Sequence, residues 1–271
     1  MTALSELAVS SELRGSVLTL TIDRPEAGNA LRHQDCVALA DAIAAADGGG
    51  GGGDQVRAIV IRAEGRHFCA GADLRVANSA AERPRIGHLV RGLEVGAHRL
   101  IATVWNSRVP CVSAVQGKAI GLGLHLAVVC DFVIAARDSV FVEPFCKRGF
   151  SVDSGGSFLL PRLVGLRRAR QMLLRGIEVD AATAVEWGLV DEVVDGTRLD
   201  DAALAVANEL AAGPTFSLGH TKDLLNSRAP SDLPSALRAE ADAVEATVRS
   251  ADFKEGIRAF AEKRDPTFSG S

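Results

Sequence analysis

Two turns built from small residues follow segments that the sequence predicts to be apolar strands. They are Ala70-Gly71-Ala72, beyond the apolar run at residues 56–62, and Gly121-Leu122-Gly123, beyond residues 111–115. Glycine accepts positive φ and lets another backbone or a ligand approach closely. N–H groups that open a helix lack intrahelical acceptors and stabilise an oxygen that gains negative charge. The turns therefore fit a pair of oxyanion donors; tight packing of helix on sheet explains the glycines equally well.

Three titratable side chains are candidates for proton transfer. Asp153 lies between Val152 and a Ser-Gly-Gly segment, an apolar setting in which a carboxyl group is a candidate acid or base; the simpler interpretation is a helix N-cap. His125 is a second candidate acid or base because imidazole side chains commonly serve in this role, but a core histidine with both nitrogens satisfied fits as well. Glu143 is a reserve candidate, because Pro144 interrupts its segment.

Two common catalytic or nucleotide-binding motifs are excluded. Residues 149–153 read Gly-Phe-Ser-Val-Asp, with Asp where a serine-hydrolase nucleophile elbow requires its second glycine. Gly121-Leu122-Gly123 lacks the third glycine of a dinucleotide-binding loop, and no acidic residue ends a strand at the required distance.

Composition narrows the class of protein further. The chain has 271 residues, a net charge of −4 and five cysteines without a CxxC pair, so we expect neither disulfide nor metal. The sequence has no basic excess that would favour nucleic acid as a partner, and no long apolar span that would favour a membrane. The N-terminus shows no signal-peptide pattern, and the default expectation is a cytoplasmic protein.

Periodicity divides the chain into two parts. Strands are predicted at residues 16–22, 56–62, 111–115 and 132–135, with a long helix at 83–107, which favours an α/β core over residues 1–195. From residue 196 to 271 only helices are predicted, at 200–212, 214–226, 231–249 and 251–263. Such a helical region commonly covers a site or builds an oligomer.

Three blocks together resemble the crotonase superfamily, the enoyl-CoA hydratase/isomerase family. They are IDRPEAGNAL (22–31), GRHFCAGADL (65–74) and QGKAIGLGLHLAVVCD (116–131), and the similarity continues in order through VDSGGSFLLPRLVG, AVEWGLVDEVV and EGIRAFAEKR. The resemblance implies a spiral of ββα units, C-terminal helices that assemble a homotrimer or homohexamer, and an acyl-CoA thioester substrate with no further cofactor.

The resemblance also implies roles for individual residues. The oxyanion donors would be the N–H groups of Ala70 and Leu122. The residues along the CoA would be Arg24, Ala27, Ala70, Asp73, Leu74, Phe260 and Lys263. An ordinary solvated lysine fits position 263 equally well.

The departures from the family pattern matter most for the reaction. Enoyl-CoA hydratases use two glutamates, and their positions here are His125 and Phe145. Asp153 falls where dienoyl-CoA isomerases and the chlorobenzoyl-CoA dehalogenase carry their working aspartate. We therefore expect enoyl-CoA isomerisation through Asp153. The alternatives are hydration by His125 and Asp153, and a non-catalytic acyl-CoA-binding protein.

Overall fold

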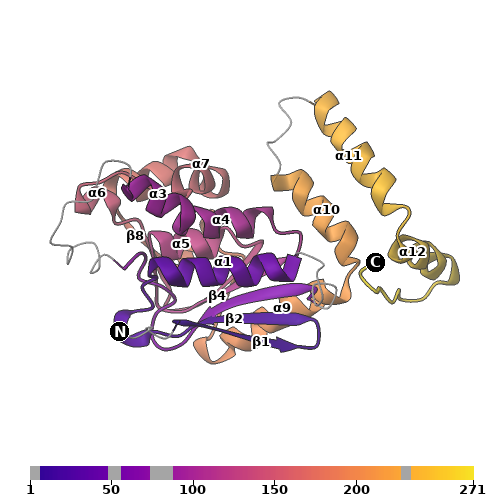
Figure 1. The fold of residues 1–271 in the computed structure, drawn as a ribbon, viewed down its shortest axis with the longest axis horizontal. Helices are drawn as coiled ribbons and strands as arrows, with labels where there is room; N and C mark the ends of the chain where they lie inside the picture. The colour runs from indigo at the N-terminus through magenta and orange to yellow at the C-terminus, as the bar shows by residue number, and fades with distance from the viewer. Residues whose placement is uncertain (1–6, 48–55, 74–87, 227–232) are drawn as a thin grey trace.

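The chain folds around two β-sheets, in a computed structural model that describes residues 7–47, 56–73, 88–226 and 233–271 (Figure 1). The larger sheet has the order β1-β2-β3-β4-β6-β9, and the smaller has the order β5-β7-β8. Strands of the larger sheet are β1 Val9–Arg14, β2 Val17–Ile22, β3 Ala58–Ala63, β4 Cys111–Val115, β6 Phe132–Ala136 and β9 Glu192–Val194. Those of the smaller are β5 Lys118–Ile120, β7 Val140–Val142 and β8 Glu178–Asp180.

The central strands β3, β4 and β6 of the larger sheet are buried at nearly every residue, as in a parallel sheet that is covered on both faces. From β2 to β9 its neighbouring strands are parallel, and only the edge strand β1 is antiparallel, pairing with β2. One face packs on α1 (His33–Asp47), α4 (Ala97–Asn106) and α5 (Leu122–Val128), through Ile59 and Ile61 of β3. The other face packs on α9 (Leu199–Ala212), through Val60 and Ala58.

Strand pairs split between the two sheets create the repeating unit of the fold. β4 lies in the larger sheet, β5 in the smaller, and α5 follows; β6 and β7 repeat this split before α6 (Phe145–Arg148) and α7 (Gly156–Arg175). This arrangement confirms the predicted α/β class built from ββα units. It also places the turn between β5 and α5 at the junction of the two sheets.

The prediction of one long helix at residues 83–107 is wrong in one respect. Residues 83–87 lie outside the described part, and the remainder forms two helices, α3 (His88–Val95) and α4, separated at Gly96. A Cβ at Gly96 would lie 2.7 Å from Nδ1 of His33, so the break occurs where α1 packs closely. The helical periodicity alone cannot indicate a contact of this kind.

The predicted C-terminal helices are confirmed within a few residues. They are α9, α10 (Thr215–Asn226), α11 (Leu233–Thr247) and α12 (Ala251–Glu262), and the short helix α8 (Ala181–Trp187) precedes them. Although α9 lies in this region of the sequence, it packs on the core sheet. The helices α10 to α12 extend away from the sheets (Figure 1). Within the described ranges, no helix has the length and apolarity needed to span a membrane.

A buried ion pair attaches α10 to the core. Lys222 Nζ lies 2.7 Å from Asp131 Oδ2, and the same oxygen accepts a hydrogen bond from the Cys111 N–H. The Lys222 side chain is 7% exposed. The pair therefore connects α10 with the start of β4 and the residue before β6.

Lys222→Met should lower the free energy of unfolding by about 1.5–3 kcal/mol, because it removes a charged hydrogen-bond partner from Asp131. Chemical denaturation measures this change. Lys118→Met is the matched control, because the Lys118 side chain is 44% exposed and its Nζ lies 4.0 Å from Glu178; its effect should stay within about 0.5 kcal/mol. Equal effects of the two substitutions would contradict a stabilising role for the buried pair.

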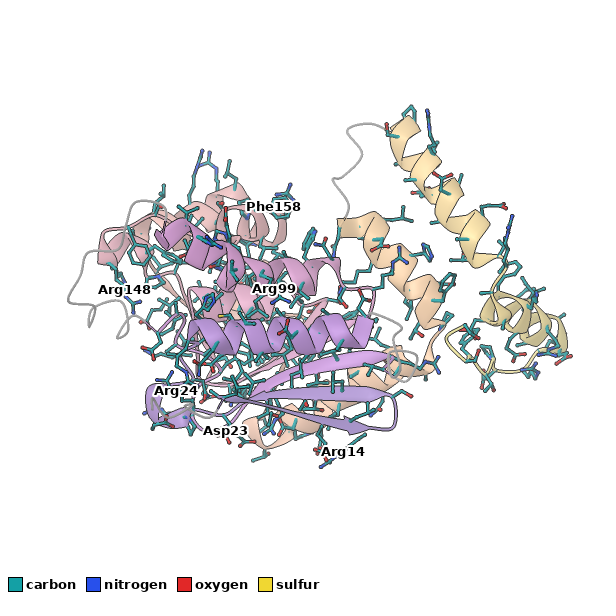
Figure 2. The ribbon with its side chains drawn as sticks, in the orientation of Figure 1. Arg14, Asp23, Arg24, Arg99, Arg148 and Phe158 are labelled. Atoms are coloured by element: carbon teal, nitrogen blue, oxygen red, sulfur yellow. The ribbon has the colours of Figure 1, made fainter. Side chains whose placement is uncertain are left out.

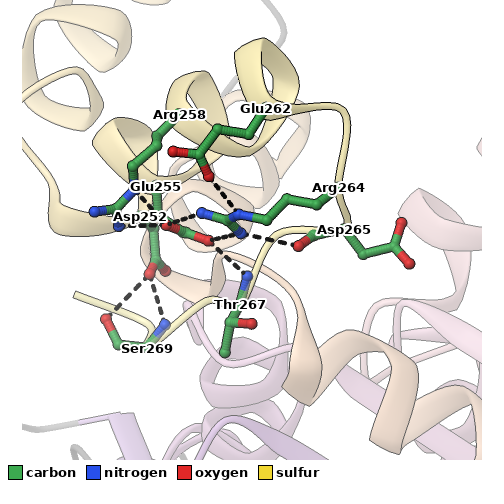
Figure 3. Close-up of polar contacts among 8 residues, drawn as sticks. All are labelled: Asp252, Glu255, Arg258, Glu262, Arg264, Asp265, Thr267 and Ser269. Carbon is green, nitrogen blue, oxygen red and sulfur yellow. Dashed lines mark hydrogen bonds and ion pairs between the residues drawn. The ribbon is translucent and has the colours of Figure 1, made fainter.

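Two carboxylates of α12 hold the C-terminal residues against the helix (Figure 3). Asp252 accepts hydrogen bonds from the N–H groups of Ser269 (2.6 Å) and Gly270 (2.8 Å). Glu255 accepts from Arg264 at 2.6 Å, from Arg258 and from the Thr267 N–H. Arg57 then links this tail to the core, because it donates to the carbonyl oxygens of Phe268 and Gly213.

This carboxylate cluster predicts a pH-dependent stability. Hydrogen bonds from Arg264, then Arg258, then the Thr267 N–H, hold the pKa of Glu255 well below its ordinary value of 4.5. A depressed carboxyl pKa contributes stability above the unfolded-state pKa, and this contribution is lost as the pH falls toward the folded-state value. The melting temperature of the wild type should therefore exceed that of Glu255→Gln at about pH 7, and the gap should narrow toward about pH 3.

Glu245→Gln provides the control for this measurement. Glu245 forms an exposed pair with Arg249 on α11, and exposed pairs contribute little. Its melting temperature should follow that of the wild type across the same pH range. A constant gap between wild type and Glu255→Gln would contradict the assignment.

Candidate active site

The loop that follows β2 is fixed by a buried asparagine. Asn29 is fully buried at φ +57°, and its Nδ2 donates to the carbonyl oxygens of Glu64 and His67. Its Oδ1 accepts from the Arg24 N–H. The loop is thereby attached to the segment that follows β3, which brings the first two sequence blocks side by side.

The segment after β3 corrects one predicted donor. The N–H of Ala70 donates to the carbonyl oxygen of Gly28 at 2.9 Å, so it already has an acceptor in the neighbouring loop. Ala70 is therefore not suited to be the oxyanion donor that the sequence predicts, although it lines the cavity described below. Its N–H serves to hold the two segments together.

The N–H of Ala72 is the better candidate. Leu31 N–H donates to Gly71 O, and Asp73 N–H donates to Leu31 O, so the backbone groups on either side of Ala72 face Leu31. Groups along an extended chain alternate in direction, and the Ala72 N–H therefore points away from Leu31. Within the described residues it has no acceptor. A Cβ at Gly71 (φ +95°) would lie 3.9 Å from the Leu122 nitrogen, which places the two turns in contact.

The second turn opens α5 at Leu122. Gly121, at φ +52°, precedes the helix, and the N–H of Leu122 has no acceptor among the described residues. Tight packing accounts for Gly123, because a Cβ there would lie 2.3 Å from the Cys69 carbonyl oxygen. Tight packing therefore explains Gly123, and the oxyanion role of the turn at Gly121 stays a prediction.

A cavity of about 40 Å³ lies between the two turns. Its lining residues are Ala70, Gly71, Ala72, Ile120, Gly121, Leu122, Pro144, Phe145, Arg148, Phe150 and Asp153. Asp153 is the only carboxylate in this lining of described residues. Arg148 contributes a cation at the end of the molecule that also carries Arg24 (Figure 2). Backbone donors and one potential proton carrier therefore share one space.

Asp153 does not cap the following helix. The N-cap of α7 is Gly155, and no side chain caps it. Instead, Asp153 begins a tight turn that its carbonyl oxygen closes by accepting from the Gly156 N–H at 3.1 Å. Ser154 (φ +49°) and Gly155 (φ +88°) occupy the central positions with the left-handed backbone of a type I′ turn. Among the described residues, its carboxylate has no hydrogen-bond or ion-pair partner.

His125 lies in the core and does not line the cavity. It is fully buried on α5, and its Nε2 lies 2.7 Å from Glu143 Oε1. The ring of Phe145 stacks on the imidazole, with centroids 6.0 Å apart, and Phe145 itself forms part of the cavity wall. The structure therefore does not bring His125 together with Asp153 as a second acid or base.

The residues predicted to contact CoA fall into two places. Arg24, Ala27 and Asp73 lie on the fixed loop and the Ala72 segment, where Arg24 Nη2 pairs with Asp73 Oδ2 at 2.7 Å. Phe260 and Lys263 belong to α12 and its C-cap, at the opposite end of the molecule from α6 (Figure 1). They do not meet the other group within one chain, and their role stays a prediction. Leu74 lies outside the described residues.

Sequence reasoning missed two wall residues, Arg148 and Phe150, and named Phe145 only as the replacement of a family glutamate. The short α6 and the residue after Gly149 supply Phe145, Arg148 and Phe150 to the cavity. No local signal in FCAGAD could have indicated Ala72, because only the pairing with Leu31 decides which N–H lacks an acceptor. The contact between His125 and Glu143 left no local signal, because it depends on how α5 packs beside the end of β7.

Comparison with known proteins agrees with this architecture. The enoyl-CoA hydratase/isomerase family matches residues 12–271. The 1,2-epoxyphenylacetyl-CoA isomerase of Escherichia coli is 37% identical, covering 97% of this chain and 98% of the relative. The 2,3-dehydroadipyl-CoA hydratase of the same organism is 33% identical, covering 98% and 100%. The crystal structure of an enoyl-CoA hydratase from Polaromonas matches with a TM-score of 0.88 at 32% identity, covering 96% and 99%.

Two sheets linked by ββα units, with small-residue turns meeting at one cavity, define a crotonase fold. More specifically, the chain belongs to the enoyl-CoA hydratase/isomerase family, whose members act on acyl-CoA thioesters. The relatives include both isomerases and hydratases, so family membership by itself does not select the reaction.

Proposed function

We propose that this protein isomerises an enoyl-CoA or ring-containing acyl-CoA thioester. The N–H groups of Ala72 and Leu122 would bind the thioester carbonyl oxygen and stabilise the enolate, while Asp153 carries a proton from one carbon to another. The observation that carries this proposal is the shared cavity with Asp153 as its single carboxylate among the described residues. Moving a proton along an enolate requires one acid/base group, whereas the family's hydration uses two carboxylates.

Space for the acyl group supports the proposal. The cavity of about 40 Å³ holds no more than the reacting atoms. A larger apolar hollow of about 310 Å³ begins on the other side of the Asp153 turn, where Ser154 and Gly155 line it together with Trp105 of α4 and Phe158 of α7. An acyl group that extended in this direction would pass directly beside Asp153.

The test is turnover of linear enoyl-CoA isomers and a ring-epoxide acyl-CoA in water enriched in ¹⁸O, followed by mass spectrometry. A rearranged product of unchanged mass supports isomerisation. Addition of labelled water would support a hydratase instead. Binding without conversion of any substrate would support a non-catalytic acyl-CoA-binding protein.

Assembly into a homotrimer or homohexamer is part of the same proposal. Apolar side chains at Phe253, Ile257 and Phe260 of α12 are exposed, and that of Phe260 is 84% exposed. Their spacing places them on one side of the helix, as an interface with a second copy of this chain requires. Light scattering after size-exclusion chromatography measures the assembly, and a monomer at assay concentrations would contradict it.

A further inference from the structure

The buried pair of His125 and Glu143 has no part in the proposed chemistry. Nε2 and Oε1 are 2.7 Å apart, and both side chains are fully buried. The other polar atoms of the pair, His125 Nδ1 and Glu143 Oε2, have no hydrogen-bond partner among the described residues. Removing such groups from water costs free energy that one hydrogen bond does not return in full. Stability alone is therefore a poor reason for this pair to occupy the core.

One neighbour of the pair is a wall of the cavity. The Phe145 ring stacks on the His125 imidazole with an interplanar angle of 8°, and its other contact is an edge-to-face one with Phe150 at 5.2 Å. A Cβ at Gly121 would lie 3.4 Å from the tip of the Phe145 ring, so this ring also reaches the turn before Leu122. The imidazole and the Phe145 ring of the cavity wall are thus neighbours with nearly parallel planes.

The other neighbour is the turn that carries Asp153. A Cβ at Gly156 would lie 2.3 Å from His125 Nε2, so the imidazole edge packs directly on this glycine. The N–H of Gly156 closes the turn by donating to the Asp153 carbonyl oxygen. A rotation of the imidazole would therefore disturb the last residue of the turn, and Asp153 is its first.

We propose that His125 and Glu143 form a positioning pair for Asp153. Glu143 fixes the orientation of the imidazole through Nε2, and the imidazole holds the Phe145 wall on its face and the Asp153 turn at its edge. Neither member touches the substrate. This inference rests on the proposed function, because it assigns the pair a role in the proton transfer by Asp153.

Two substitutions of His125 separate positioning from packing. The amide nitrogen of glutamine reaches about the place of Nε2, so His125→Gln can still donate to Glu143. Asparagine is shorter, and His125→Asn cannot. We expect kcat of His125→Asn to fall by about 10–100-fold, as when a group that orients a catalytic residue is lost, with little change in KM. His125→Gln should recover most of that loss.

A second readout separates Asp153 from the oxyanion donors. Acetoacetyl-CoA loses its acidic α-proton to solvent, and the resulting enolate, which the N–H groups would stabilise, absorbs in the near ultraviolet without any proton transfer between carbons. Its binding should be the same in the wild type, His125→Asn and His125→Gln. A melting temperature for each variant records ordinary loss of packing.

The outcomes distinguish this inference from the proposed function. Wild-type kcat in His125→Asn would overturn the positioning role and leave the proposed function intact. If His125→Gln recovers no kcat and the loss of kcat in each variant follows its loss of melting temperature, the pair serves core packing alone. A wild type that binds acetoacetyl-CoA but converts no acyl-CoA would overturn both proposals.

Discussion

Asp153→Asn should lower kcat by about 10²–10⁴-fold, the range that a positioned general acid or base contributes. Asparagine is nearly the same size as aspartate and also suits the first position of a tight turn, so the turn at Ser154 and Gly155 should persist. The amide cannot accept a proton from the α-carbon of a thioester. Steady-state turnover of the substrate identified for the wild type measures the loss.

Two measurements check that only the proton carrier has been removed. Asp153→Asn should still bind acetoacetyl-CoA as its enolate, because the N–H groups of Ala72 and Leu122 are unchanged. Asp138→Asn, at an exposed position outside the cavity lining, should turn over like the wild type. Undiminished kcat in Asp153→Asn would remove this carboxylate from the mechanism.

The sequence could indicate Asp153 and Leu122 because their signals are local. The strand at residues 111–115 and the helix start at Leu122 are confirmed, but the structure adds the short strand β5 between them, before Gly121. Likewise, Asp153 stands beside the Gly-Gly pair that opens α7. The apolar pattern of each segment is enough to place such elements, and hence the two core blocks of the site.

Local sequence patterns could not predict which backbone groups pair between distant segments. Ala70 and Ala72 are both small residues in the same turn, and only the pairing of Leu31 with Ala72 decides which N–H remains without an acceptor. The hydrogen bond between His125 and Glu143 depends in the same way on packing between α5 and the end of β7. Contacts between segments far apart in the sequence fixed both details.

Leu122→Pro tests the proposed oxyanion donor, and its expected loss of kcat is the second largest among the substitutions. Leu122 is the first residue of α5, where proline is tolerated because its fixed φ suits a helix start and its missing N–H has no intrahelical acceptor. The substitution therefore removes the proposed donor and leaves the remaining helix hydrogen bonds in place. Loss of one such donor is expected to lower kcat by about 10²–10³-fold.

Leu122→Ala is the matched control, since the Leu122 side chain is only 3% exposed and both variants lose its packing. The alanine variant keeps the N–H, so the ratio of its kcat to that of Leu122→Pro isolates the donor from the cavity left in the core. The enolate absorbance of acetoacetyl-CoA should disappear in Leu122→Pro and remain in Leu122→Ala. Equal kcat and equal absorbance in the two variants would show that the Leu122 N–H does not bind the thioester oxygen.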